Sequence, residues 1–292
     1  MDLEAVRVFL RVAELSSFTK AAEQLGLSKS RASLRVRALE DELGSHLFQR
    51  TTRAVRLTPD GEQLLARARR LVTEADDISS MFQAPSTLRG RVRVELPINI
   101  ARDVLIPRLP ELFAAHPHLD VVLGTSDRRV DVVREGFDCV LRIGALGDSG
   151  LMSRRLGALP MASYVGEAYA RKHGVPKTLG DLARHFVVHY SQSLTGEPVF
   201  EWEERGRTRF VPMRALVTVN NADAYEAACR AGLGIIQAPK WRRPSRDQLI
   251  EVLPDHTCRP MPVTLLHAHG KNVPKRVRAV MTWLEHVLTE VL

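Results

Sequence analysis

A cluster of basic and hydroxyl side chains near the start of the chain has the chemistry to bind DNA. Residues 29–56 carry seven Lys or Arg side chains against three carboxylates, in a chain of 292 residues with a net charge of +8. This local surplus suits a phosphate backbone, although by charge alone a solvated helix face is an equal alternative. The candidate DNA contacts are Thr19, Ser28, Lys29, Ser30, Arg31, Ser33, Leu34, Arg35, Arg50, Arg53 and Arg56.

These candidates divide by the part of the DNA that each would contact. Five lie in the first turns of a predicted recognition helix and are expected at base edges in the major groove: Lys29, Ser30, Arg31, Ser33 and Leu34. Arg35 would reach both bases and backbone. Arg50, Arg53 and Arg56 are expected at phosphates or in the minor groove, with Arg53 nearest the tip of a β-wing.

A second group of side chains could hold a small molecule. Most of them follow the carboxyl end of a predicted strand, which is where open α/β sheets bind their ligands. The candidates for this effector site are Pro97, Ile98, Asn99, Ile100, Ser126, Arg142, Ile143, Gly144, Tyr190, Ser191, Asn221 and Gln237. Asp127 follows the same predicted strand as Ser126.

The expected chemistry of the effector is that of a small anion. Two predicted helix starts, near 99–102 and 221–224, would suit a carboxylate through their N–H groups and dipoles. For Asn221, capping its own helix is an equal alternative. Arg142 is either a counter-charge or an exposed side chain at a strand end. Nearby isoleucines make the site partly apolar and favour an aromatic or short-chain acid.

Other residue patterns argue against further chemistry. Cys139, Cys229 and Cys258 are widely spaced and lack CxxC spacing, so neither a disulfide framework nor a zinc site is predicted. His267 and His269 alternate on a predicted strand without a further ligand at metal-binding spacing, so no metal is expected. Neither a G-x-S-x-G elbow nor a nucleotide-binding glycine motif occurs. We therefore expect no cofactor and no enzymatic activity.

The DNA-contact candidates need a helical scaffold to position them. Residues 3–15 predict an amphipathic helix, whose apolar face carries Leu3, Val6, Phe9, Leu10 and Ala13. A second, short helix is predicted over residues 19–25, starting near Thr19 and stopped by Gly26.

A third helix would be the recognition helix. It is predicted from the N-cap Ser28 to about Leu43, with Gly44 as its stop. The spacing of its apolar residues predicts an inward face made of Ala32, Val36, Leu39 and Leu43. The second and third helices form a helix-turn-helix, and the alternation around Arg56 predicts a short β-wing.

A long helix is predicted over residues 59–83, capped by Thr58 and begun by Pro59. Its apolar residues step by four and three, as in a coiled coil: Leu64, Ala68, Leu71, Ala75, Ile78 and Phe82. A single buried helix could show the same pattern, but its place between two globular parts favours dimerisation.

Beyond Pro85 the pattern changes to that of an α/β body. The predicted strands of its first part are 92–96, 119–125 and 137–143, alternating with helices over 101–115 and 128–135. A second, similar part is predicted to have strands 160–166, 186–191, 215–220 and 233–238. Strand 261–268 and helix 274–291 close the chain. This alternation predicts a mostly parallel sheet with helices on both faces.

The segment "SFTKAAEQLGLSKSRASLRVRALEDELGSHLFQRTTRAVRLTPDGEQLL" resembles the LysR-type transcriptional regulators. It keeps the pattern SF-x-x-AA-x-x-L, S-x-S, LE-x-x-LG-x-x-LF-x-R and LT-x-x-G. The shorter segments "EGFDCVLRIG", "RRLG" and "AGLGIIQAP" are similar to effector-domain segments of the same family. Lys29 and Leu34 depart from the common pattern, which often has Gln and a basic residue there.

The resemblance implies an all-α winged helix-turn-helix, a dimerising linker helix and a two-lobed α/β effector domain like the type 2 periplasmic binding proteins. We expect these over residues 1–58, 59–88 and 89–292. Lobe I would span about 89–160 and 266–292, and lobe II about 161–265. A small molecule bound between the lobes would then alter transcription.

The expected partners are double-stranded promoter DNA, a small-molecule effector and a second copy of the chain bound through 59–83. A tetramer through the effector domains and contact with RNA polymerase are further expectations. No signal peptide and no apolar run of membrane-spanning length is present, so we expect a cytoplasmic bacterial protein, associated with the nucleoid when bound to DNA. Two alternatives stay open: a DNA-binding regulator without a physiological ligand, and a solute-binding protein or enzyme built on the same α/β body.

Overall fold

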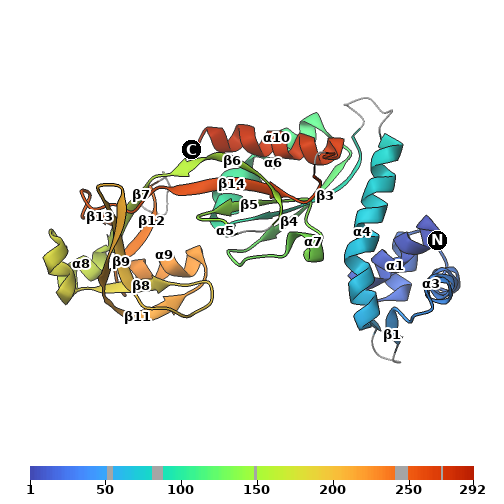
Figure 1. The fold of residues 1–292 in the computed structure, drawn as a ribbon, viewed down its shortest axis with the longest axis horizontal. Coiled ribbons are helices and arrows are strands. Elements are labelled where there is room, and N and C mark those ends of the chain that lie inside the picture. Colours follow the sequence, from blue (N-terminus) through green and yellow to red (C-terminus); the bar gives the residue numbers. More distant parts are fainter. Residues whose placement is uncertain (51–54, 81–87, 148–149, 241–248, 271) are drawn as a thin grey trace. The chain divides into compact units, whose positions relative to one another are not determined.

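The chain folds into two compact units, shown as a ribbon in Figure 1. The computed structural model describes residues 1–50, 55–80, 88–147, 150–240, 249–270 and 272–292. The first unit comprises Met1–Gly90 together with Asp131–Gly136, and the second comprises Arg91–Val130 with Phe137–Leu292.

The first unit begins with three helices: α1 (Leu3–Leu15), α2 (Phe18–Gln24) and α3 (Lys29–Leu43). The predicted bounds of α1 and α3 are confirmed. The Ser28 side chain accepts the Arg31 N–H at 3.2 Å, and Gly44 ends α3 in the left-handed conformation. The predicted start of α2 near Thr19 is one residue late, because Ser17 is the N-cap and accepts the Lys20 N–H.

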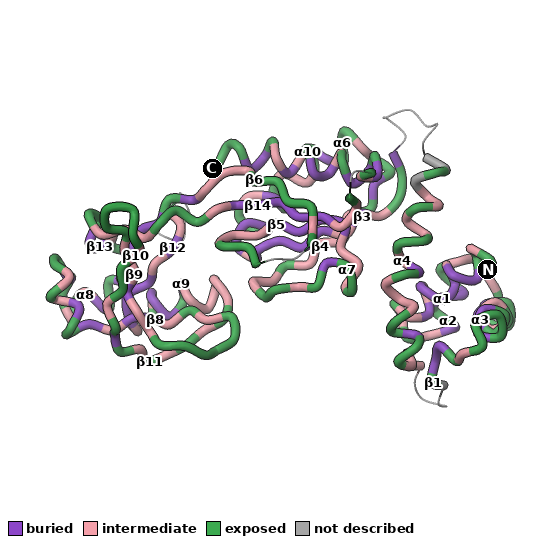
Figure 2. Tube along the Cα trace, in the orientation of Figure 1, coloured by how far each residue is buried: buried purple, intermediate pink, exposed green. Residues whose placement is uncertain are grey.

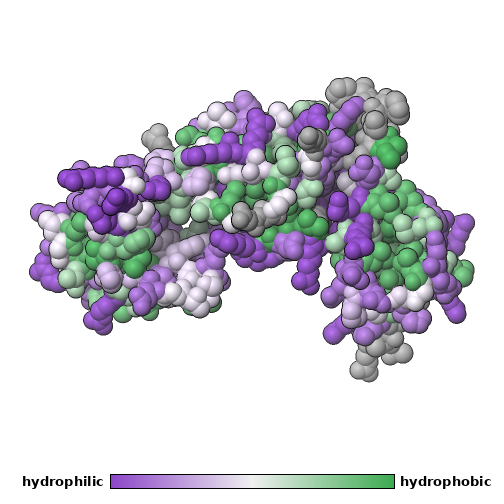
Figure 3. All heavy atoms as spheres, in the orientation of Figure 1, coloured by the Kyte–Doolittle hydropathy of each residue, from purple (hydrophilic) through white to green (hydrophobic). Residues whose placement is uncertain are grey.

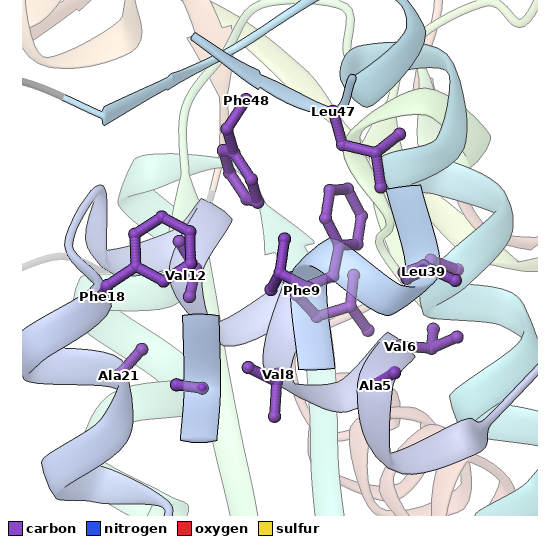
Figure 4. Close-up of a cluster of buried hydrophobic side chains, with 14 of the residues drawn as sticks. Ala5, Val6, Val8, Phe9, Val12, Phe18, Ala21, Leu39, Leu47 and Phe48 are labelled. Carbon is purple, nitrogen blue, oxygen red and sulfur yellow. The ribbon is translucent and has the colours of Figure 1, made fainter. Parts of the chain in front are cut away.

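The core of this unit forms where α1 packs on α2, α3 and the first strand, β1 (Phe48–Arg50). Figure 4 shows this cluster, with Phe48 facing Phe9 and Phe18 at ring-centroid distances of 5.3 and 5.6 Å. The predicted inward face of α3 is confirmed for Ala32, Val36 and Leu39, which are buried.

The predicted burial of Leu43 is wrong, because 43% of this side chain is exposed. Glu40 is buried there instead. Its carboxylate accepts the N–H groups of Leu47 at 2.8 Å and Phe48 at 3.2 Å. A backbone N–H buried without a partner is destabilising, so the start of the strand needs this acceptor on the inward side of α3.

The predicted wing is an antiparallel pair of β1 and β2 (Val55–Leu57), in which Gln49 lies opposite Arg56. The helix α4 (Pro59–Ser80) follows, and Thr58 caps it as predicted by accepting the Gly61 N–H at 3.0 Å. Gly61 is required here, since a Cβ would lie 2.2 Å from the Leu47 carbonyl oxygen.

The predicted apolar seam of α4 divides into two parts. Ala68 is buried in the core of the unit and Leu64 packs against it. Leu71 and Ile78 are 39% and 58% exposed, and Phe82 lies outside the described residues. Figure 3 shows hydrophobic residues gathered on this face of the first unit. The described helix thus leaves part of its seam in solvent.

The second unit contains two lobes, and lobe I is built on a five-stranded sheet of order β4-β3-β5-β14-β6. These strands are β3 (Gly90–Leu96), β4 (Leu119–Thr125), β5 (Cys139–Ile143), β6 (Met152–Leu159) and β14 (Met261–His267). Figure 2 shows that the middle of this sheet is buried. The helix α10 (Lys275–Thr289) runs alongside β6 and β14 (Figure 1). All of β14 belongs to this sheet, whereas the expected lobe boundary at 265/266 falls inside it.

Lobe II contains a three-stranded sheet, a parallel pair and a hairpin. The sheet has β7 (Met161–Gly166) between β12 (Ile236–Pro239) and β13 (Leu249–Val252). The pair joins β8 (Phe186–Tyr190) to β11 (Arg214–Val219), and the hairpin joins β9 (Val199–Glu204) to β10 (Arg207–Pro212). The helices of this lobe are α8 (Glu167–His173), a 3-10 segment (Leu179–Arg184) and α9 (Ala222–Arg230).

The prediction of a mostly parallel sheet is wrong. In lobe I, β3 and β5 are parallel, but β14 is antiparallel to both β5 and β6. In lobe II, β12 and β13 are both antiparallel to β7. The sequence pattern missed β6, β9, β10 and β13, and these strands supply most of the antiparallel pairing.

The predicted helix 101–115 is a broken helical run. It consists of α5 (Ile98–Ile100), a π-helical turn (Ala101–Leu105), a 3-10 turn (Ile106–Arg108) and α6 (Leu109–Ala115). Pro107 and Pro110 lack the N–H that a continuous α-helix needs. The predicted helix 128–135 shortens to α7 (Val132–Glu135), because the Asp131 carboxylate caps it by accepting the N–H groups of Val133 and Arg134. None of the described helices combines the length and the apolar character needed to cross a bilayer.

Candidate functional site

The first candidate site is the exposed amino-terminal part of α3. Lys29, Ser30 and Arg31 are exposed there, and 65% of Leu34 is exposed. Their outward position follows from the burial of Ala32 and the later inward residues on the opposite face of the helix. The hydroxyls of Ser28 and Ser30 lie 3.0 Å apart. This surface offers cationic and hydroxyl donors with one apolar side chain, which is the set that reads base edges.

The other candidate DNA contacts lie around this surface. Thr19 is exposed in the first turn of α2, Ser33 is half-buried, and Arg56 is exposed on β2. Arg53 and the side chain of Arg50 lie outside the described residues.

Arg35 is engaged within the protein. Its guanidinium donates to the Asp2 carboxylate at 3.0 Å, and Asp2 also caps α1 by accepting the Glu4 N–H at 2.9 Å. Both side chains are partly exposed, so this ion pair contributes little stability and can be exchanged for a phosphate.

The second candidate site lies where lobe I meets lobe II, and Asp127 is at its centre. The carboxylate of Asp127, just after β4, accepts the Ala222 N–H at the start of α9 at 2.6 Å. It also accepts the backbone N–H of Ile98. The carbonyl oxygen of Asp127 accepts a hydrogen bond from Gln192 Nε2 at 2.6 Å. One residue of lobe I therefore binds two segments of lobe II.

An ion pair also links the lobes beside this carboxylate. Arg102 Nη1 donates to both carboxylate oxygens of Asp223 at 2.9 Å, and Arg102 also pairs with Asp103. Asp223 follows Ala222 in the first turn of α9. The guanidinium thus compensates the charges of Asp223 and Asp103.

Burial raises the pKa of Asp127, and the charge of Asp223 adds to this shift. The N–H groups of Ala222 and Ile98, and the positive charge of Arg142, oppose it. Burial likewise raises the pKa of Tyr190 to about 12, with a further contribution from Asp127. Both shifts are those of acidic groups withdrawn from water and placed near one another.

Four of the predicted effector residues gather at or beside this carboxylate. Ile98 donates its N–H to it, Arg142 and Tyr190 interact with its charge, and Asn221 directly precedes the bonded Ala222. Asn221 also caps α9 by accepting the Ala224 N–H at 2.8 Å, so the predicted cap is confirmed, while a contact of Asn221 with a ligand stays a prediction. Tyr190 packs edge-on against Tyr225 at 5.3 Å.

Other predicted effector residues are occupied within their own lobes. Ser126 donates its hydroxyl to the buried Glu95 at 2.5 Å, and the Ser191 hydroxyl closes a turn to the Thr195 carbonyl at 2.6 Å. The Gln237 amide exchanges hydrogen bonds with the backbone of Glu201 and so joins β12 to β9.

The remaining predicted effector residues lie beside these contacts in sequence. Pro97, Asn99 and Ile100 are buried, while Ile143 and Gly144 are half-buried at the end of β5. Arg142, on the same strand, donates to the Arg128 carbonyl at 2.9 Å. The sequence could identify Asp127 as a residue at a strand end, but no sequence signal pairs it with Ala222.

The cysteines and histidines form no comparable centre in the described part of the chain, where no group of three or more His, Cys, Asp or Glu side chains could hold a metal ion. Burial raises the pKa of Cys139 and raises that of Cys258 to about 12, so neither is a ready thiolate. His269 lies 3.3 Å from Asp138, and its ring stacks on that of His267.

Two family models match the chain. The model described as "LysR substrate binding domain" matches residues 85–289, and "Bacterial regulatory helix-turn-helix protein, lysR family" matches residues 3–62. The first spans the second unit up to its last three residues, and the second spans the helix-turn-helix, the wing and the start of α4.

Curated relatives match over nearly the whole chain. The uncharacterized HTH-type transcriptional regulator YhjC of Escherichia coli K12 is 37% identical, over 99% of both chains. The HTH-type transcriptional repressor PA14_22550 of Pseudomonas aeruginosa is 33% identical, over 99% of this chain and 92% of its own. The HTH-type transcriptional activator AaeR of Escherichia coli K12 is 34% identical, over 99% and 94%.

Solved structures match at full length as well. CrgA, a LysR-type transcriptional regulator from Neisseria meningitidis, is 26% identical with a TM-score of 0.60 over 98% of both chains. A full-length variant of OxyR from Pseudomonas aeruginosa is 20% identical with a TM-score of 0.69, over 100% of this chain and 99% of its own, which supports the fold alone.

Proposed function

The chain belongs to the LysR family of transcriptional regulators, and on this premise we propose that it is a homodimer that reads promoter DNA through α3 and the β1–β2 wing. As a family member, it is a DNA-binding regulator with a ligand-responsive domain. We further propose that its effector is a small acidic molecule bound between the lobes. The site of action would be bacterial DNA in the cytoplasm, with RNA polymerase as a further partner.

The DNA-reading part of the proposal is supported by the exposed face of α3. Lys29, Ser30 and Arg31 lie in its first turn, where a recognition helix meets base edges. Leu34 adds an apolar contact of the kind that a thymine methyl group makes. Arg56 on the adjacent wing would contact a phosphate, and the same role is proposed for Arg50 and Arg53.

The dimer is supported by α4. Leu71 and Ile78 are exposed on a helix whose apolar residues repeat as in a coiled coil, so a second copy of α4 would bury them. Two recognition helices held by one dimer bind two half-sites on the same face of the DNA. Assembly into a tetramer through the effector domains would extend this to two such pairs.

An acidic effector is supported by the groups at the interlobe site. The start of α9 already binds a carboxylate, that of Asp127, through a backbone N–H. Arg142 supplies positive charge close by, and Tyr190 and Tyr225 supply aromatic surface. These groups would suit an aromatic or short-chain acid.

The proposal is tested in two steps with the full chain. First, binding is measured to DNA fragments that flank the chain's own coding region, against scrambled DNA of equal length. Second, aromatic and short-chain carboxylic acids are screened by thermal shift, because a ligand of the native state raises the Tm. We expect the protein to bind and protect one sequence, the operator, in a flanking fragment. We also expect at least one acid to raise the Tm and to change the binding of the protein to that operator.

Each step can fail separately. Equal affinity for the flanking and scrambled fragments would contradict sequence-specific reading. A protected operator with no stabilising acid would instead favour a regulator that works without a physiological ligand. The direction of control is outside the proposal, because relatives named as a repressor and as an activator are almost equally similar.

A further inference from the structure

Lobe I and lobe II are joined by three polar contacts, in which Arg102 and Asp127 of lobe I bind the start of α9 and Gln192 of lobe II. Asp127 binds Ala222 N–H through its carboxylate and Gln192 through its carbonyl. Arg102 binds Asp223 with two bonds of 2.9 Å. We call these three contacts the clasp.

Asp127 contributes two of the three contacts, and it does so from a half-buried position. A carboxylate withdrawn from water is unfavourable unless N–H groups and positive charge compensate it. Here the compensation comes from both lobes: Ile98 N–H and Arg142 belong to lobe I, and Ala222 N–H belongs to lobe II. Separating the lobes would therefore remove a hydrogen bond from a charged group that depends on it.

The two segments that Asp127 binds carry the aromatic pair of the site. Gln192 lies two residues beyond Tyr190, and Tyr225 stands in the first turns of α9, which starts at the bonded Ala222. The rings of Tyr190 and Tyr225 are 5.3 Å apart. A shift of either segment relative to lobe I moves this aromatic surface relative to Asp127, whose charge acts on Tyr190.

We infer that Asp127 is the positioning residue of the interlobe site, which holds α9 and the Gln192 segment against lobe I through the clasp. This inference rests on the proposed function, since it assigns the clasp to the site where an effector would act. A ligand that binds the clasped and unclasped arrangements with different affinity shifts the population between them. Asp127 thus sets which arrangement the protein holds before the effector arrives.

Hydrogen–deuterium exchange of the full chain tests this inference at the bond itself. The variants are Asp127→Ala, Asp127→Asn and, as a matched control, Asp120→Ala. Asp120 is on β4 of the same lobe, its side chain is 73% exposed, and it pairs only at 3.6 Å with Arg91 among the described contacts. The readout is the exchange rate of peptides that contain the Ala222 amide.

In Asp127→Ala we expect exchange at the start of α9 to rise about tenfold, because a charged hydrogen bond to that amide is lost. Asp127→Asn keeps an acceptor oxygen and should retain part of the protection. Asp120→Ala should exchange like the unmodified chain.

Added formate distinguishes the carboxylate from the bulk of the side chain. It should restore protection to Asp127→Ala, but not alter the unmodified chain or Asp120→Ala, with sodium chloride at equal ionic strength as the salt control. Unchanged exchange in Asp127→Ala would overturn the inference. Raised exchange that formate fails to reverse would overturn the role of the carboxylate.

Neither DNA nor an effector enters this experiment. If Asp127→Ala raises the exchange as expected but neither an operator nor a stabilising acid is found, the clasp is supported and the proposed function fails. If the exchange is unchanged in Asp127→Ala but the protein binds an operator specifically, the clasp fails and the proposed DNA reading is supported.

Discussion

The carboxylate of Glu40 on α3 accepts the N–H of Leu47 at 2.8 Å, and so ties the recognition helix to the start of the wing. The same oxygen accepts the Phe48 N–H at 3.2 Å. Glu40 is 6% exposed, which makes it a buried acid with a structural task in the DNA-binding unit. The bond fixes where the wing begins relative to the first turns of α3.

Replacing Glu40 should destabilise the DNA-binding unit. In Glu40→Ala two backbone N–H groups lose a buried acceptor, and we expect a loss of about 2–4 kcal/mol in the free energy of unfolding. Glu40→Gln retains an acceptor oxygen and should lose less. Denaturant unfolding measures both. The neighbouring Asp41 is exposed, so Asp41→Ala should stay within about 0.5 kcal/mol of the unmodified chain. Equal losses at positions 40 and 41 would contradict the buried bond.

Arg31 should discriminate between operator and random DNA. If it reads a base, Arg31→Ala weakens operator binding by about 1–3 kcal/mol more than random binding. The control is Arg37→Ala, an exposed arginine farther along α3, which should affect both DNAs alike. A fluorescence anisotropy titration gives the two affinities. Equal losses on both DNAs for Arg31→Ala would reassign this side chain to a phosphate.

Arg56 should contribute affinity without specificity. Its side chain is exposed on β2 of the wing, where a phosphate contact is expected. In Arg56→Ala, we predict nearly uniform weakening across sequences and a salt dependence that is shallower by about one phosphate contact. Titration over a range of salt concentrations measures the slope. An unchanged slope would remove Arg56 from the DNA contacts.

The exposed seam of α4 should control assembly. Ile78→Glu places a charge on a position that is 58% exposed in the single chain and would be buried in a paired α4. We expect the dimer to dissociate at concentrations where the unmodified chain stays associated, as measured by sedimentation. Arg70→Glu changes an exposed residue of the same helix and should leave the sedimenting mass of the dimer unchanged. If Ile78→Glu sediments with the same mass as the unmodified dimer, the dimer interface lies outside the α4 seam.

The ionisation of Asp127 should appear in the pH dependence of stability. Burial raises its pKa in the folded chain, so the folded state takes up a proton at a higher pH than the unfolded state. The unfavourable contribution of the buried charge is therefore present above the folded pKa and is relieved as pH falls toward about 4, the ordinary value for Asp.

Comparison with Asp127→Asn isolates this effect, because the variant carries no titratable group there. Between neutral pH and about pH 4, we expect the unmodified chain to gain stability relative to Asp127→Asn. Urea unfolding at several pH values measures the difference. A difference that stays constant, or that grows in the opposite direction, would contradict the raised pKa.

The DNA-binding unit could be predicted closely because its signals are local. Ser28 and Gly44 mark the ends of α3, and the spacing of Ala32, Val36 and Leu39 assigns its inward face. The same spacing failed at Leu43, where the backbone of the following strand requires the carboxylate of Glu40. Periodicity reports which residues are apolar, but not where a buried N–H needs an acceptor.

The effector domain was harder because its decisive pairings are between distant residues. The direction of β14 depends on β5 and β6, and neither partner is encoded in the apolar pattern of β14 itself. Asp127 and Ala222 are 95 residues apart, so no local motif joins them. The predicted helix start near 221–224 is confirmed, but the carboxylate bound there is that of Asp127 in the same chain.

The central claim is that this chain couples DNA reading to a small molecule, and one titration tests it most directly. The full chain is titrated with its operator and with scrambled DNA, each with and without an acid that raises its Tm. The account predicts that the acid changes the operator affinity or the protected region and leaves scrambled DNA unaffected. An acid that stabilises the protein but changes neither operator property would contradict the coupling.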